Sequence, residues 1–323
     1  MKIAITWDYE LFFGSRSGTV DKCMLEPTKR ILEVAEKHEV PFTFFPDVGS
    51  LLRFQDLPEF SADLHAVISQ VQQWDALGHE TGLHIHPHWE KSVWENEAWR
   101  HPMECYKLSD FTDEEAKAIV LKYHAFIQSK VTTPILSYRA GGWCVQPFSR
   151  LASGFDECGI RYDSSVFKQG KNTQAPYQYD FTKAPNLPFW HFESDELLPV
   201  VNAKFTEFPI ASRMYSPLFF WKLFVLGRLN PRDHKGIGNG VPAAGGGSKF
   251  DLLTRAHRLC VSVDGYYASK LQQTLHRFEK KQEPILVVIG HPKALTHFGL
   301  SRLDAFIQKN KEKHEFVKLQ DLT

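Results

Sequence analysis

The sequence predicts an α/β protein, a distorted (β/α) barrel of seven or eight parallel strands with an irregular insertion. Short apolar runs alternate with amphipathic stretches through most of the 323 residues, which is typical of parallel strands covered by helices. Polar residues also follow directly after several of the expected strands, which is where parallel α/β folds carry their catalytic and binding residues. Seven or eight strand–helix units are the number expected of a closed or nearly closed barrel.

The expected elements follow from apolar periodicity and from helix start and stop signals. Strands are expected at 2–7, 41–45, 81–85, 135–138, 160–162, 205–208, 285–289 and 316–319. Helices are expected at 26–38, 62–77, 112–131, 147–158, 266–281 and 301–311. Pro27 suits the first turn of the first helix, and Gly78 follows the end of the second. Thr112 and Glu115 have the spacing of a capping box at the start of the third.

The region 167–260 interrupts this alternation. It is rich in proline, aromatic residues and glycine, including GIGNG at 236–240 and GGG at 245–247. The glycines lack the Lys-Ser/Thr pair of a nucleotide-binding loop, which favours a lid or connector. Because the region has too few periodic apolar stretches for its own core, we expect one domain over 1–323, with 167–260 as an insertion or lid.

The most apolar run is 214–229 (MYSPLFFWKLFVLGRL). It is too short for a membrane span and contains Lys222 and Arg228. We expect a helix buried against the barrel, and the alternative is an interfacial helix that makes peripheral contact with a membrane.

Charge and cysteine usage restrict the class of protein. The 38 basic and 38 acidic residues give a formal charge of zero, so no nucleic-acid partner is expected. The five cysteines are scattered without C-x-x-C spacing, as expected of reduced thiols in an intracellular protein. The sequence opens on a strand rather than on a signal segment, so we expect a cytoplasmic protein.

Four histidines lie within the segment 78–88 (GHETGLHIHPH). His84 and His88 are four residues apart, a spacing that lets two imidazoles face one point on a helical turn or tight loop. Zinc and its first-row neighbours bind such nitrogen atoms, and a catalytic site needs three protein ligands with one open position. The segment therefore indicates a metal-dependent hydrolase, and the alternative is a polar turn with solvated histidines.

Five motifs occur in the order found in one family of enzymes. They are TWDYE at 6–10, the histidine segment at 78–88, RAGGW at 139–143, YDSS at 162–165 and IGHP at 289–292. The sequence resembles the polysaccharide deacetylase (NodB homology) family, also grouped as carbohydrate esterase family 4. The resemblance runs from residue 1 to about 323, with 167–260 poorly covered, and it implies a distorted (β/α) barrel.

The resemblance also implies roles for individual residues. His84 and His88 would bind a divalent metal, with zinc expected, together with a carboxylate. Asp8 would be the catalytic base, Arg139 would pair with it, and His291 would be the general acid. The oxyanion would be stabilised by the metal and by a backbone N–H near residues 141–143.

The first motif departs from the family pattern. Its usual form has two adjacent aspartates followed by glycine, whereas Tyr9 takes the second place here. Because alternate residues of a strand point the same way, we expect Glu10 to be the metal carboxylate and Asp8 the base. The reversed assignment stays open, as does a degraded site without metal.

Five residues are expected to contact substrate. Trp143 and Trp89 could stack on sugar rings, with Gly142 beside them. His86 lies between the two proposed ligands and could contact substrate or support a ligand. Asp163 could orient Arg139 or His291, or it could cap a turn.

The expected function is the removal of an acetyl group from an N-acetylated or O-acetylated sugar, an intermediate of surface glycan biosynthesis. One alternative is hydrolysis of a small cyclic amide on the same barrel. A second is a glycosidase that uses Asp8 and Glu10, and a third is a non-catalytic glycan-binding relative.

Overall fold

β1 (Lys2–Tyr9) is the central strand of this computed structural model, which describes residues 1–243 and 249–323. It pairs in parallel with β15 (Ile285–Gly290) on one side and β2 (Thr43–Pro46) on the other. β2 continues to β3 (Glu80–Thr81), and β16 (Glu315–Phe316) pairs with the start of β1. Every residue of β1 after Lys2 is buried, as its apolar run predicts.

A second set of strands continues the sheet. β4 (Leu83–Ile85), β7 (Ser137–Ala140), β8 (Tyr162–Asp163) and β12 (Phe205–Glu207) pair in parallel in this order. The antiparallel strand β11 (Trp190–Phe192) lies at the edge.

The predicted strand at 81–85 is split in two, because Gly82 separates β3 from β4. A Cβ atom at Gly82 would lie 2.3 Å from the ring of Phe45, so only glycine fits where the sheet bends.

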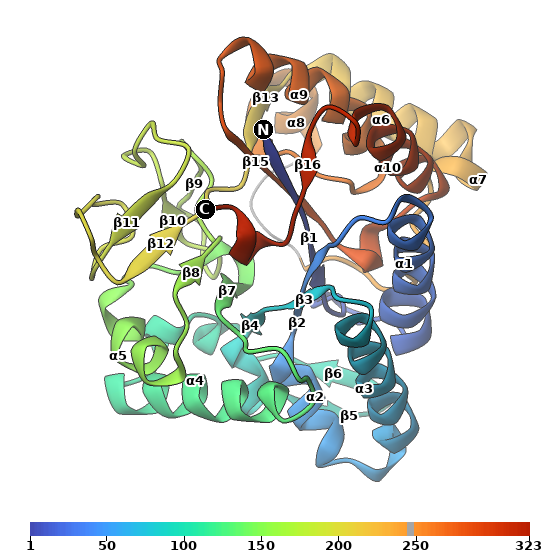
Figure 1. The fold of residues 1–323 in the computed structure, drawn as a ribbon. Coiled ribbons are helices and arrows are strands. Elements are labelled where there is room, and N and C mark those ends of the chain that lie inside the picture. Colours follow the sequence, from blue (N-terminus) through green and yellow to red (C-terminus); the bar gives the residue numbers. More distant parts are fainter. Residues whose placement is uncertain (244–248) are drawn as a thin grey trace.

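Backbone hydrogen bonds bridge the remaining gap between β12 and β15. Ala211 N donates to Val287 O, Val261 N donates to Ala211 O, and Val263 N donates to Ile289 O. With β3 and β4 counted together, seven parallel strands form a distorted, nearly closed (β/α) barrel in the described part of the chain (Figure 1). The predicted fold class is confirmed.

Helices cover the outside of these strands (Figure 1). They are α1 (Glu26–His38), α3 (Ser61–Ala76), α4 (Asp113–Gln128), α5 (Ser149–Cys158), α9 (Leu271–Lys280) and α10 (His297–Asn310). The capping box of α4 is present, with Glu115 N donating to Thr112 Oγ1 and Thr112 N to Glu115 Oε2. Gly78 has a φ of +82° after α3, the left-handed conformation expected there.

Some elements differ from the sequence prediction. Helix α2 (Val48–Gln55) and the hairpin of β5 (Val93–Glu95) and β6 (Ala98–Arg100) were not predicted, because they are short and weakly periodic. The helix expected at 266–281 begins as a 3₁₀ turn (Gly265–Lys270) before α9.

The region 167–260 does more than cover the barrel, because β11 and β12 belong to it. It also forms the hairpin of β9 (Lys171–Asn172) and β10 (Tyr179–Asp180) and the pair β13 (Ser212–Tyr215) and β14 (His257–Cys260). Its helices are α6 (Pro217–Leu229), α7 (Pro231–His234) and α8 (Lys249–Thr254). Of the two glycine runs, 245–247 lies outside the described residues, and Val241 just after the other exchanges backbone hydrogen bonds with Gly14 and Arg16.

Helix α6 corrects one expectation. It forms within the predicted apolar run, but only one face is buried: Phe219 and Phe220 are buried, whereas Trp221 is 53% exposed and Leu229 79% exposed. Within residues 1–243 and 249–323, no helix is both long enough and apolar enough to cross a bilayer.

Candidate active site

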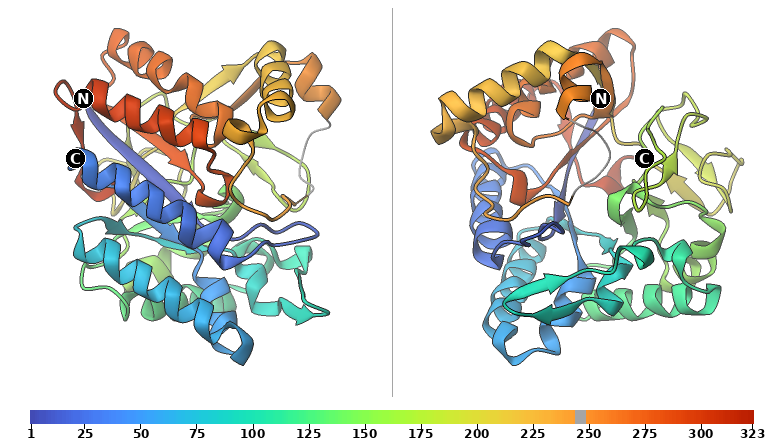
Figure 2. Two further views of the ribbon diagram at one scale, coloured as in Figure 1. Left: turned by 90° about the vertical axis from the view of Figure 1, so that its right-hand side faces the viewer. Right: turned by 180° about the vertical axis from the view of Figure 1, so that it is seen from behind.

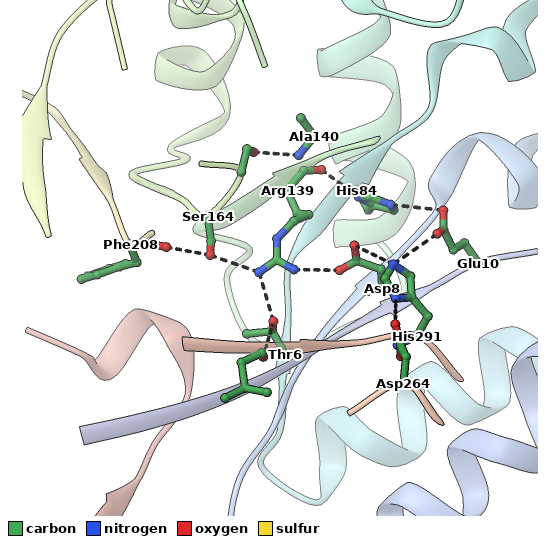
Figure 3. Close-up of polar contacts among 12 residues, drawn as sticks. Thr6, Asp8, Glu10, His84, Arg139, Ala140, Ser164, Phe208, Asp264 and His291 are labelled. Carbon is green, nitrogen blue, oxygen red and sulfur yellow. Dashed lines mark hydrogen bonds and ion pairs between the residues drawn. The ribbon is translucent and has the colours of Figure 1, made fainter. Parts of the chain in front are cut away.

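Polar residues from separate strands meet at the carboxyl end of the barrel (Figure 3). β1 carries Asp8 and is followed by Glu10, β4 carries His84, β7 carries Arg139, and His291 follows β15. The close-up shows these side chains directed toward one another, as the positions after strand ends predict.

Three of the buried side chains form a group that could hold a metal ion. One ligand atom from each of Glu10, His84 and His86 lies within 4.8 Å of the other two. Glu10 Oε2 is 2.7 Å from His86 Nε2 and 3.4 Å from His84 Nε2. Among the described residues these three atoms make no hydrogen bond to any other group. Buried polar atoms left in this state are costly unless a cation binds them.

The hydrogen bond of His84 and the charge states of His86 and Glu10 also suit a cation. His84 Nδ1 is 2.8 Å from Arg139 O, so Nδ1 carries the proton as donor and leaves Nε2 free to bind metal. Burial lowers the pKa of His86 to about 4, which keeps this imidazole neutral. Burial works against ionisation of Glu10, but Lys293 and His86 outweigh it and hold the pKa of this carboxyl well below its usual range.

The sequence predicts His88, not His86, as the second imidazole ligand. The chain is extended through β4 and His86, whose φ is −110°, so alternate residues 84 and 86 face the same side. His88 lies in the following 3₁₀ turn (Pro87–Lys91), and its ring stacks on Tyr106 with centroids 5.2 Å apart. The structure therefore brings His86 into the group and leaves His88 outside it, because the four-residue spacing faces one point only on a helical turn.

Arg139 orients Asp8, as the sequence analysis expected. Arg139 Nη1 donates to Asp8 Oδ1 at 3.0 Å (Figure 3). Arg139 Nη2 donates to Thr6 Oγ1 and Ser164 Oγ, each also at 3.0 Å, and the arginine is fully buried. The guanidinium is thus fixed on both sides, and Asp8 Oδ2 remains directed toward the site.

His291 is held by Asp264, a residue that the sequence analysis missed. His291 Nδ1 is 2.8 Å from Asp264 Oδ2, and His291 N donates to Asp264 Oδ1 at 2.7 Å. His291 Nε2 lies 3.7 Å from Asp8 Oδ2 and 3.8 Å from Glu10 Oε1. Burial lowers the pKa of His291, but the three carboxylates outweigh it and raise this pKa to about 9. The mostly apolar segment at 259–263 (LCVSV) was the available signal for Asp264, as a carboxylate that follows an extended segment.

Lys293 is a second residue that the sequence analysis did not identify. Its Nζ lies 2.9 Å from Glu10 Oε1 and donates to Leu11 O at 2.7 Å. The lysine thus holds one oxygen of Glu10 and leaves Oε2 toward the two histidines. No sequence signal distinguished it from other lysines near a strand end.

A cavity of about 350 Å³ opens onto these groups. Its aromatic and apolar wall includes Phe12, Phe13, Tyr106, Gly142, Trp143, Tyr177 and Tyr179, and its polar floor includes Asp8, Glu10, His86, His291 and Lys293. A larger cavity of about 840 Å³ lies near Ile285 and the two termini, at the opposite end of the strands, so we assign the site by its converging groups rather than by size.

Two of the expected substrate contacts do not reach the cavity. Trp89 is fully buried and donates its indole N–H to Asp47 Oδ2 at 2.5 Å, so it is a core residue. Asp163 is buried and accepts a hydrogen bond from Ser165 Oγ at 2.5 Å, so it supports the strand end behind Arg139. Of the five expected residues, Gly142, Trp143 and His86 line the cavity.

The sequence matches no protein family model and no curated protein. Among solved structures, a Mycobacterium smegmatis protein assigned as a polysaccharide deacetylase has a TM-score of 0.53 and 14% identity, covering 99% of this chain and 88% of that one. This chain has the fold of the polysaccharide deacetylases.

Two further structures have similar scores. PuuE allantoinase has a TM-score of 0.51 and 14% identity, covering 99% of this chain and 88% of its own. The 4-α-glucanotransferase from Thermococcus litoralis has a TM-score of 0.52 and 13% identity, covering 99% of this chain but 38% of its own. Because these proteins are named for different reactions, the likeness shows the fold, and the activity has to be argued from the site.

Proposed function

We propose that this chain is a metal-dependent hydrolase that removes an acetyl group from an N-acetylated or O-acetylated sugar, in the biosynthesis of a surface glycan. The observation that carries the proposal is the convergence of buried atoms of Glu10, His84 and His86 that have no hydrogen-bond partner outside this group among the described residues. They lie beside a carboxylate oriented by arginine and a histidine oriented by aspartate. The likeness to a polysaccharide deacetylase supports the choice of reaction.

Zinc is the metal that fits these donors best. Two imidazole nitrogens and one carboxylate oxygen form the ligand set of many catalytic zinc sites, with one position left for water or substrate. When bound, the cation supplies Lewis acidity, which polarises the acetyl carbonyl and makes a nearby water more acidic.

Asp8 is proposed as the general base. Arg139 occupies Oδ1, so Oδ2 is the oxygen available to accept a proton from the attacking water. The fixed guanidinium keeps this carboxylate from rotating toward Glu10, His84 and His86, which separates its role from that of Glu10.

His291 is proposed as the general acid. Its raised pKa keeps the imidazole protonated at neutral pH, and Asp264 fixes Nδ1 so that Nε2 faces the cavity. The proton on Nε2 can pass to the nitrogen or oxygen of the leaving sugar as the bond to the acetyl carbon breaks.

The cavity wall supports a sugar as substrate. Trp143, Tyr177 and Tyr179 present flat apolar surfaces of the kind on which pyranose rings stack. A volume of about 350 Å³ is near the lower end for ligand pockets, which favours one sugar unit over the middle of a polymer.

Hydrolysis of a small cyclic amide is the second candidate, because an allantoinase shares the fold. Purified protein should be assayed for acetate release from N-acetylhexosamines and for ring opening of allantoin and hydantoin. Acetate release that is lost with chelator and regained with zinc supports the proposal. Ring opening without acetate release would favour the cyclic amide as substrate. No turnover of either substrate class by the metal-bound protein would contradict both candidate functions.

A further inference from the structure

Helix α6 is apolar on two opposite faces. On one face, Phe219 and Phe220 pack with Tyr215 in a buried cluster. The other face is uncovered and carries four large apolar residues: Leu218, Trp221, Val225 and Leu229, exposed by 63%, 53%, 44% and 79%. At about 100° per residue, these four side chains fall within an arc of roughly 80°. We call them the α6 stripe.

Helix α8 extends this apolar surface. Trp221 Nε1 donates to Leu253 O at 3.2 Å, which ties α6 to α8. Phe250 of α8 is 74% exposed. Figure 2 shows both helices at the edge of the molecule, in gold and orange, away from the central strands. Single exposed apolar residues are common, but five on two adjacent helices indicate an interaction surface.

The charge around the α6 stripe is mostly positive. From 214 to 258 the chain has seven Lys or Arg residues and two Asp residues, although the whole chain is neutral. On the helix, Lys222 projects about 40° to one side of Leu218, and Arg228 projects about 80° to the other. Asp233 accepts a hydrogen bond from Asn230, and Asp251 is paired with His257. The apolar stripe is therefore flanked by cations whose stems can lie along it.

We propose that the α6 stripe and Phe250 dock on a lipid bilayer that contains anionic headgroups, with α6 lying in the plane of the interface. Apolar side chains would enter the headgroup–acyl boundary, and the flanking cations would meet lipid phosphates. A second copy of the chain fits less well, because a symmetric pair would bring the same cationic face against itself. This inference is independent of the proposed activity.

The test is co-sedimentation of the full chain with vesicles of phosphatidylcholine alone and of phosphatidylcholine mixed with phosphatidylglycerol. Wild type should bind the mixed vesicles and not the neutral ones. The variant Leu218→Ser/Trp221→Ser/Leu229→Ser should bind at least about tenfold more weakly. The matched control is Leu198→Ser/Val201→Ser, which changes two residues that are 60% and 87% exposed elsewhere, and it should bind like wild type.

A charge variant tests the second part of the inference. Lys222→Gln/Arg228→Gln should bind mixed vesicles more weakly by a factor of about five for each charge, and the loss should shrink as salt is added. The unfolding midpoint of this charge variant should match that of wild type, because both substituted side chains are exposed.

Several results would overturn the proposal. Wild-type protein that fails to bind mixed vesicles, or that binds neutral vesicles equally well, would contradict the proposal. A stripe variant that binds like wild type would also contradict the proposal. A wild-type dimer that the stripe substitutions convert to a monomer, without vesicle binding, would instead assign the surface to contact between copies.

Discussion

Arg139 Nη1 lies 3.0 Å from Asp8 Oδ1, and the same guanidinium is bound to Thr6 and Ser164 behind it. Asp8 is therefore oriented by a buried arginine, whereas Glu10, two residues later on the same face of the chain, is directed to His84 and His86. Two carboxylates of one strand end thus meet different partners, and this separation underlies the assignment of different roles.

Asp8→Asn should keep the metal and lower turnover by about 10²–10⁴, the usual contribution of a general base. Glu10→Gln should weaken metal retention, because it removes the charge from the only carboxylate of the proposed ligand group. Metal content and kcat of both variants are the measurements. If Asp8→Asn loses metal while Glu10→Gln retains it, the two roles are reversed.

The plot of rate against pH should be bell-shaped, because Asp8 must be ionised and His291 must be protonated for turnover. Carboxylates, Asp264 foremost, raise the pKa of His291 to about 9 against the effect of burial, so activity is lost as pH rises through that value. A cation bound at Glu10 would offset part of this negative charge and would place the alkaline limb of the profile below 9. Asp264→Asn should move the alkaline limb of the pH profile to still lower pH. An unchanged alkaline limb would show that Asp264 does not keep His291 protonated.

His291→Ala should lower turnover of an acetamide strongly while metal content stays unchanged. The loss should be smaller for p-nitrophenyl acetate, because nitrophenolate leaves without a proton from an acid. Equal losses on both substrates would assign His291 a structural or binding role instead.

The two tryptophans should respond differently to substitution. Trp89→Ala should lower the free energy of unfolding by roughly 3–5 kcal/mol, because it removes a fully buried side chain. Trp143→Ala should mainly raise KM for the sugar, since Trp143 lines the cavity. Denaturant unfolding and steady-state kinetics of both variants are the measurements. A Trp143 variant with unchanged KM would argue against stacking on substrate.

The sequence predicted the barrel because its strands are separated by well-formed amphipathic helices, and strand ends identified Asp8, Glu10, His84, Arg139 and His291. The choice between His86 and His88 depended on local backbone conformation, since a strand alternates with a period of two and a helix with nearly four. Spacing alone could not decide it.

Asp264 follows the segment 261–263, which bonds to Ala211 and to β15 only when the barrel closes, so its approach to the site could not be inferred from local pattern. Lys293 lies in the 3₁₀ turn (Pro292–Ala294) after β15, and the direction of its side chain depends on that turn rather than on the strand pattern. Trp89 was misassigned because an aromatic residue beside a histidine cluster has the same sequence signature in a core as in a binding site.

Zinc stoichiometry of His86→Ala and His88→Ala, measured by elemental analysis beside wild type, tests the account most directly. We expect one zinc per wild-type chain, loss of that zinc in His86→Ala, and retention in His88→Ala, because the His88 ring stacks on Tyr106 outside the ligand group. Circular dichroism should confirm that both variants fold. Retention of zinc by folded His86→Ala together with its loss from folded His88→Ala would contradict the proposed ligand set. Activity of the wild-type protein without metal would contradict the proposed mechanism.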